Sequence, residues 1–139
     1  MCNLFAGKLF PDFLVVELES NIKLRLSDVM NKAGSVPFVV NFGSCSSPNF
    51  MAMLGEYEAL MDRTSRQDIN FIIVYMEEAH PIETGDYAPD SGYPQMKQPT
   101  SIEERLSNAS ALAEHTKIPI YVDTIYNWGQ SLYGAFPER

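Results

Sequence analysis

Residues able to do chemistry gather in two short segments of this chain. Residues 43–47 read Gly-Ser-Cys-Ser-Ser and carry one thiol and three hydroxyls. Residues 77–80 read Glu-Glu-Ala-His and place two carboxylates beside an imidazole. An ionised thiol is a strong nucleophile, and a histidine next to carboxylates is suited to proton transfer near neutral pH. The sharper hypothesis is therefore a redox site, and the plainer one is a buried cysteine plus a loop histidine bonded to its neighbours.

The first segment lies where a predicted buried strand passes into a predicted helix. The apolar run Phe38–Phe42 is too short for a helix and rich in residues that favour strands. Ser47-Pro48 is typical of a helix start, with a capping serine before a proline at the first helical position. Free N–H groups and the positive end of the helix dipole gather at such a start. We therefore expect Cys45 to be exposed, with a pKa below that of a free cysteine.

The second segment follows another apolar run, Ile69–Met76, which predicts a second buried strand. Before the first segment, the pattern predicts a hairpin over Phe13–Leu26 and a short helix from Ser27 to about Lys32. The helix after Ser47 has apolar residues at helical spacing: Phe50, Met53, Leu54, Tyr57, Leu60 and Met61. After the second segment, we expect a loop over Ile82–Pro99, a helix that begins in a capping box at Ser101–Glu104, a strand over Ile118–Val122 and a last helix over Asn127–Ala135. The helix with the capping box should bury Ile102, Leu106, Ala109 and Leu112 or Ala113. We expect Trp128 to belong to the core.

Strands that alternate with helices predict an α/β fold with a mainly parallel sheet and an N-terminal hairpin. Ligands of such sheets bind at the carboxyl ends of the strands. Both chemical segments directly follow a predicted strand. We therefore expect residues 43–47 and 77–80 to face one another.

Composition excludes several classes of function. The formal net charge of the 139 residues is −8, and without a cluster of lysine and arginine a nucleic-acid partner is not expected. No apolar run approaches the roughly 20 residues of a membrane span. The two cysteines and two histidines lack the spacing of a disulfide framework or a metal site. We expect a soluble, acidic, intracellular protein of one domain with no bound cofactor.

Several motifs resemble those of the iodothyronine deiodinases. Residues 41–50, Asn-Phe-Gly-Ser-Cys-Ser-Ser-Pro-Asn-Phe, are similar to the family's active-site segment, Asn-Phe-Gly-Ser-Cys-Thr-selenocysteine-Pro-Pro-Phe. The resemblance continues in order along the chain through Ile73–Pro81, Ser101–Leu106, Val122–Thr124 and Tyr133–Arg139. It covers roughly residues 38–139.

This resemblance implies a thioredoxin-like fold and a selenoenzyme reaction. Members of the family reductively remove iodide from thyroid hormones with a thiol cosubstrate, usually as membrane-tethered homodimers. The resemblance places Ser47 at the selenocysteine position and Cys45 at an accessory cysteine. It also implies that Glu77, Glu78 and His80 belong to the substrate site, with His80 as a proton donor or a ligand of the iodinated aromatic substrate. We expect the pKa of His80 to be tuned by one of the two glutamates.

The chain departs from the family at other positions. The family's Asp-Gly-Trp after its histidine is replaced by Ile82-Glu83-Thr84-Gly85, and a second family histidine falls on Pro99. The resemblance further leads us to expect a tail over residues 1–12 and a domain over 13–139 that lacks the closing C-terminal hairpin and helix. The strand Phe38–Phe42 would then have an uncovered edge.

Ser47 leaves several alternatives open, because a serine hydroxyl does not ionise near neutral pH. Three explanations of the serine at position 47 compete. The nucleophile has been lost naturally and a helix cap remains, the serine replaces a selenocysteine, or Cys45 has taken over the redox role. The corresponding functions are a deiodinase-like oxidoreductase, a catalytically silent binding protein of the family, or a peroxiredoxin-like thiol reductase that uses Cys45.

Overall fold

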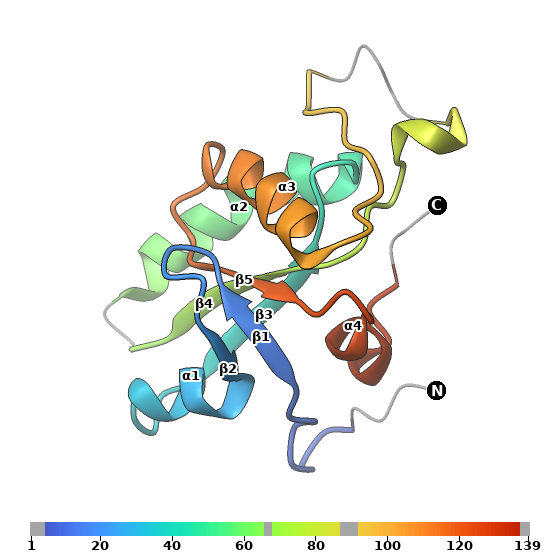
Figure 1. The fold of residues 1–139 in the computed structure, drawn as a ribbon. Helices are drawn as coiled ribbons and strands as arrows, with labels where there is room; N and C mark the ends of the chain where they lie inside the picture. Colours follow the sequence, from blue (N-terminus) through green and yellow to red (C-terminus); the bar gives the residue numbers. More distant parts are fainter. Residues whose placement is uncertain (1–4, 66–67, 87–91, 137–139) are drawn as a thin grey trace.

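A five-stranded sheet forms the centre of the molecule, in the order β2-β1-β5-β4-β3. It is seen in a computed structural model that describes residues 5–65, 68–86 and 92–136 (Figure 1). β3 (Phe38–Gly43) pairs parallel with β4 (Asn70–Tyr75), which pairs parallel with β5 (Ile120–Asp123). The two pairings of β1 are antiparallel. The prediction of an α/β fold is confirmed, but the sheet is mixed rather than mainly parallel, because the hairpin joins it through β1.

The N-terminal hairpin is confirmed. β1 (Leu14–Glu17) pairs with β2 (Lys23–Arg25). Asn21 in the connecting turn has a φ of 58°, a left-handed conformation that asparagine tolerates better than most residues. Val15 and Val16 are buried in the cores on opposite faces of the sheet, so β1 is covered on both sides, whereas Lys23 of β2 is exposed.

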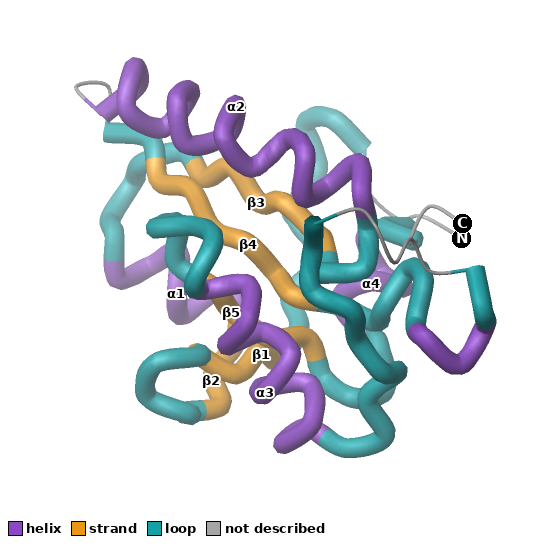
Figure 2. Tube along the Cα trace, turned by 90° about the horizontal axis from the view of Figure 1, so that it is seen from above, coloured by secondary structure: helices purple, strands orange, loops and turns teal. Residues whose placement is uncertain are grey.

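Helices cover both faces of the sheet, as Figures 1 and 2 show. α2 (Pro48–Thr64) and α3 (Ile102–Ala113) pack on one face, over a core that includes Phe71, Ile73 and Tyr75. α1 (Leu26–Lys32) and α4 (Trp128–Tyr133) lie on the other. There the core includes Ile72 and Val74, so β4 is buried on both sides.

The parallel strands all end at the same edge of the sheet. Gly43, the last residue of β3, is opposite Tyr75, the last of β4, and Tyr75 is opposite Val122 of β5. The segments after β3, β4 and β5 therefore start close together. This edge carries the candidate site.

The predicted buried face of α3 needs correction. Ser101 caps α3 as expected, and the Glu104 carboxylate accepts hydrogen bonds from the N–H and hydroxyl of Thr100. The buried face of α3 consists of Arg105, Ala109 and Leu112, whereas Ile102 and Leu106 are only partly buried.

Other boundaries shift by a few residues. β5 begins at Ile120 rather than Ile118, and α4 covers only Trp128–Tyr133. The predicted loop after β4 contains a short 3-10 helix, η2 (Ile82–Thr84). Trp128, expected in the core, is 55% exposed. Cys2 and the Pro-Glu-Arg motif at residues 137–139 lie outside the described residues.

Candidate functional site

The two chemical segments meet, and Ser46 joins them. Its hydroxyl donates a 2.6 Å hydrogen bond to Oε2 of Glu78, and its N–H donates to the same oxygen at 3.2 Å. The same hydroxyl accepts a 3.1 Å hydrogen bond from the N–H of His80. Two residues before Ser46, the Ser44 hydroxyl accepts a hydrogen bond from the N–H of Ala79 at 3.3 Å. The prediction that the segments after β3 and β4 face one another is confirmed.

Glu78 is completely buried beneath this junction. Besides Ser46, its carboxylate accepts hydrogen bonds from the Tyr75 hydroxyl and, at 3.0 Å, from the Asn108 side-chain amide of α3. A buried carboxylate is stable only when hydrogen bonds replace its hydration, and these donors do so. The geometry makes Glu78 a support for the turn, which differs from the substrate contact that the resemblance implies.

Tyr75 completes the support from the end of β4. Its hydroxyl accepts a 3.2 Å hydrogen bond from the N–H of Cys45 while it donates to Glu78. Burial raises the pKa of Tyr75 well above its usual value, and the nearby Glu78 carboxylate adds to the rise. The tyrosine therefore stays protonated and can keep donating to Glu78.

Ser47 is the N-cap of α2, as predicted. Its hydroxyl accepts a 3.3 Å hydrogen bond from the N–H of Phe50, and its carbonyl accepts one from Met51 at 3.0 Å. The residue is 7% exposed. The side-chain atom at this position therefore faces the N–H groups and the positive end of a 17-residue helix, which favour a negative charge.

Cys45 contradicts the expectation of an exposed, acidic thiol. The residue is completely buried, and its Sγ lies 3.8 Å from the carbonyl oxygen of Asn108. Burial raises the pKa of Cys45 to about 12; the Tyr75 hydroxyl opposes the rise and the Glu78 carboxylate adds to it. The turn directs this thiol under α3 rather than towards the start of α2. As the structure stands, Cys45 is a small core residue.

His80, the predicted proton donor, has a side chain that is 21% exposed. Its Nδ1 lies 3.3 Å from Oδ2 of Asp86. The expected pairing with Glu77 or Glu78 is wrong, because Glu78 binds the Ser46 turn and Glu77 binds the segment after β5. The carboxylate that His80 does meet comes from just beyond η2.

Glu77 joins the site to α4. Its carboxylate accepts hydrogen bonds from the side-chain amides of Asn127 at 3.1 Å and Gln130 at 2.7 Å. The first turn of α4 is held by Asp123, the last residue of β5. The Asp123 carboxylate accepts hydrogen bonds from the N–H groups of Gly129 at 3.0 Å and Gln130 at 2.8 Å. Burial raises the pKa of Asp123, although these backbone donors oppose the rise. The segments after all three parallel strands are thus tied together.

Arg105 is a buried cation near the site that sequence reasoning missed. It is 2% exposed and donates to the Thr124 carbonyl at 2.6 Å. Burial lowers its pKa, and the opposing charges of Asp123, Glu77 and Glu78 limit that fall. Helical spacing could have predicted the burial of Arg105, because position 105 lies four residues before the buried Ala109 on the same face of α3.

The described residues contain no helix long and apolar enough to cross a membrane. Within the same residues, no cluster of three or more histidine, cysteine, aspartate or glutamate side chains is arranged to hold a metal ion.

Comparisons with known proteins show to which family the chain is similar. The family model described as iodothyronine deiodinase matches residues 3–139. The thyroxine 5-deiodinase of Ovis aries is 40% identical over 107 residues, which are 76% of this chain and 36% of that protein. Those of Sparus aurata and Gallus gallus are 35% and 36% identical over 135 residues, which are 96% of this chain and 48% and 50% of theirs.

The chain therefore spans between 36% and 50% of the length of these curated relatives. The family model covers nearly all of the chain, and the sheep enzyme shares 40% of the aligned residues. The chain belongs to the iodothyronine deiodinase family.

Proposed function

We propose that this chain is the thioredoxin-like domain of a deiodinase that removes iodide reductively from iodinated aromatic compounds of the thyroid-hormone type. Family membership supports the reaction class, and the relatives are named thyroxine 5-deiodinases. The strand–turn–helix over β3 and α2 and the helices on both faces of the sheet support the thioredoxin-like fold. A homodimer, as is usual in the family, is part of this proposal.

The observation that carries the proposal is the placement of residue 47. The side chain at this position accepts the N–H of Phe50 at the start of α2, on a turn that Glu78 holds through Ser46. A selenolate or thiolate in place of the hydroxyl would accept the same N–H and be stabilised by the helix dipole. This environment supports the proposal of an anionic nucleophile at position 47.

The net reaction balances with two thiols for each iodide. An aryl iodide and two thiols give the deiodinated arene, one disulfide, one proton and one iodide ion. The carbon–iodine bond breaks, a carbon–hydrogen bond forms, and the thiols supply both electrons. His80, next to the turn and partly exposed, is the group we assign to proton delivery.

With serine at position 47, this position lacks a nucleophile that ionises near neutral pH. A catalytically silent binding protein of the family is therefore the second candidate, favoured by the use of the Ser47 hydroxyl as a helix cap. The third, a thiol reductase that relies on Cys45, is opposed by the burial and raised pKa of that thiol.

Iodide release from a radioiodinated iodothyronine with dithiothreitol tests the proposal. Ser47→Cys should release iodide faster than the unchanged chain, because it supplies a thiol at the helix start. Ser65→Cys is the matched control, since it adds an exposed thiol at the other end of the same helix and should leave the rate unchanged. Equal rates for both variants would reject residue 47 as the nucleophile position.

A further inference from the structure

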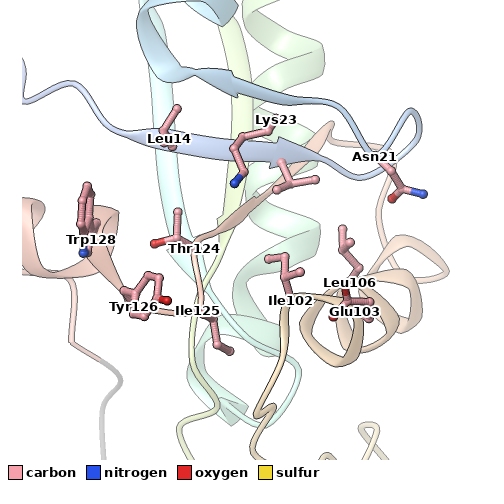
Figure 3. Close-up of a pocket in the computed structure, with 11 residues that line it drawn as sticks. Leu14, Asn21, Lys23, Ile102, Glu103, Leu106, Thr124, Ile125, Tyr126 and Trp128 are labelled. Carbon is pink, nitrogen blue, oxygen red and sulfur yellow. The ribbon is translucent and has the colours of Figure 1, made fainter.

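A cavity separate from the Ser46–Glu78 junction lies at the β1 side of the sheet. It has a volume of about 550 Å³, within the range of roughly 300–1,000 Å³ that small-molecule sites occupy. Its aliphatic walls come from β1, the start of α3 and the segment after β5 (Figure 3). They consist of Leu14, Val16, Ile102, Leu106 and Ile125. Ser46, Ser47, Glu78 and His80 are not among the residues that line it.

Two large aromatic side chains at this cavity are exposed to solvent. Tyr126 is 76% exposed and Trp128 is 55% exposed, and both lie on the side opposite α3 (Figure 3). A tryptophan with half of its surface in water has apolar area that a ligand could cover, and aromatic rings favour ring-shaped partners. The shape and the lining therefore suit a ligand with an apolar body that contains a ring.

The charges around the cavity favour an anion. The Lys23 side chain reaches across β1 towards the face on which Thr124 lies (Figure 3). Among the described residues, no hydrogen-bond or ion-pair partner is found for the Lys23 ammonium group. Glu103, the acidic residue of the cavity, lies in the first turn of α3, where the positive end of the helix dipole offsets part of its charge. Lys23 is the cation of the lining and is available to pair with an anionic ligand.

A polar atom in the lining is also unused. The Thr124 hydroxyl is buried and has no hydrogen-bond partner among the described residues. A buried hydroxyl without a partner is costly, and a rotation about its χ1 angle would let it donate to a group in the cavity. A carboxylate would accept this hydrogen bond as well as pair with Lys23.

We propose that this cavity binds a small monocarboxylic acid whose apolar body contains a ring. The aliphatic walls, Tyr126 and Trp128 contact the body, and Lys23 and Thr124 hold the carboxylate. The site is independent of the proposed deiodination, because it shares no lining residue with the Ser46–Glu78 junction.

Trp128 makes binding directly measurable, because it is the only tryptophan of the chain. The probes are 5-phenylvalerate, its neutral amide and 5-phenylpentylamine, which share one apolar body and do not absorb where tryptophan is excited selectively. Titration of the full chain with 5-phenylvalerate should give a saturable blue shift of the Trp128 emission. The amide should bind more weakly and the amine weakest.

Lys23→Gln tests the charge, since Lys23 is exposed and its replacement leaves the fold intact. It should weaken 5-phenylvalerate binding by up to about five-fold, as expected for a solvent-screened ion pair, and leave the amide unchanged. Lys32→Gln, on an exposed lysine of α1 away from the cavity, is the matched control and should bind like the unchanged chain. Equal affinity for the three probes, no saturable shift, or unchanged binding by Lys23→Gln would overturn the proposal.

Discussion

The hydroxyl of Ser46 and the carboxylate of Glu78 are joined by a 2.6 Å hydrogen bond that links the turn after β3 to the segment after β4. The residue after Ser46 is the N-cap of α2, so this bond helps to set where the side chain at position 47 points. Because Glu78 is fully buried, its hydrogen bonds are made in a low dielectric, where losing them is costly.

Replacing Glu78 should destabilise the protein. Glu78→Gln keeps the size of the side chain but puts an amide where Ser46, Tyr75 and Asn108 donate to a carboxylate. The free energy of unfolding in urea should fall by about 1–3 kcal/mol. Glu19→Gln, at an exposed glutamate, serves as the control and should change it by less than about 0.5 kcal/mol. Equal stability of both variants would show that Glu78 does not hold the turn.

Cys45 should be almost inert towards alkylation at pH 8 in the folded protein. Its pKa is raised from the ordinary 9.0 to about 12, so very little thiolate forms, and burial blocks access. Iodoacetamide labelling in a Cys2→Ser background measures this rate, and labelling in urea gives the unfolded reference. Fast labelling of the folded chain would contradict the buried position and revive the redox role.

The raised pKa of Cys45 also predicts how stability depends on pH. A thiol with a higher pKa in the folded state stabilises that state fully below the unfolded pKa of 9.0, and the contribution is lost as pH rises towards about 12. The free energy of unfolding should therefore decline across this alkaline range, and less steeply in Cys45→Ala. Parallel declines in the two proteins would argue against a buried thiol.

β3, the edge strand of the sheet that the described residues form, should promote association through its outer edge. It is the last strand of the sheet, and the Pro37 and Gly43 carbonyls accept hydrogen bonds from the β4 side. Strand alternation then points the N–H of Val40 outwards. Sedimentation should show association that grows with concentration and is weakened by Val40→Pro, whereas Val39→Pro removes an inward N–H and should unfold the sheet. A monomer at every concentration would contradict an adhesive edge.

His80 should affect turnover rather than folding. In a Ser47→Cys background, His80→Ala should slow iodide release, because proton delivery to the arene is lost. Its melting temperature should change little, since the side chain is partly exposed and its hydrogen-bond partner, Asp86, is itself more than half exposed. Asp86→Asn serves as the comparison, because it removes the carboxylate beside His80 and keeps the imidazole. An equal loss of thermal stability and of rate in His80→Ala would make the histidine structural.

The sequence was sufficient for the parts of the site that depend on local pattern. The apolar run before Gly43 and the Ser-Pro pair at 47–48 predict β3 and the cap of α2, and both are confirmed. The rule that parallel strands end at one edge predicts the contact between Ser46 and the segment after β4.

What could not be predicted depends on contacts distant in sequence. The burial of Cys45 is set by the Asn108 carbonyl on α3, 63 residues away. The partner of His80 is Asp86, which a turn after η2 brings back. The mixed sheet follows from the antiparallel docking of β1 on β5, which no periodicity reveals.

Iodide release by the chain with selenocysteine in place of Ser47 tests the central claim most directly. A selenol is ionised at neutral pH and should be stabilised by the start of α2, so release from a radioiodinated iodothyronine with dithiothreitol should be fastest with selenocysteine, slower with Ser47→Cys and near background with serine. Selenocysteine in place of Ser65 should stay at background. Equal release from the two selenocysteine proteins, or none from either, would contradict the assignment of position 47 as the nucleophile site.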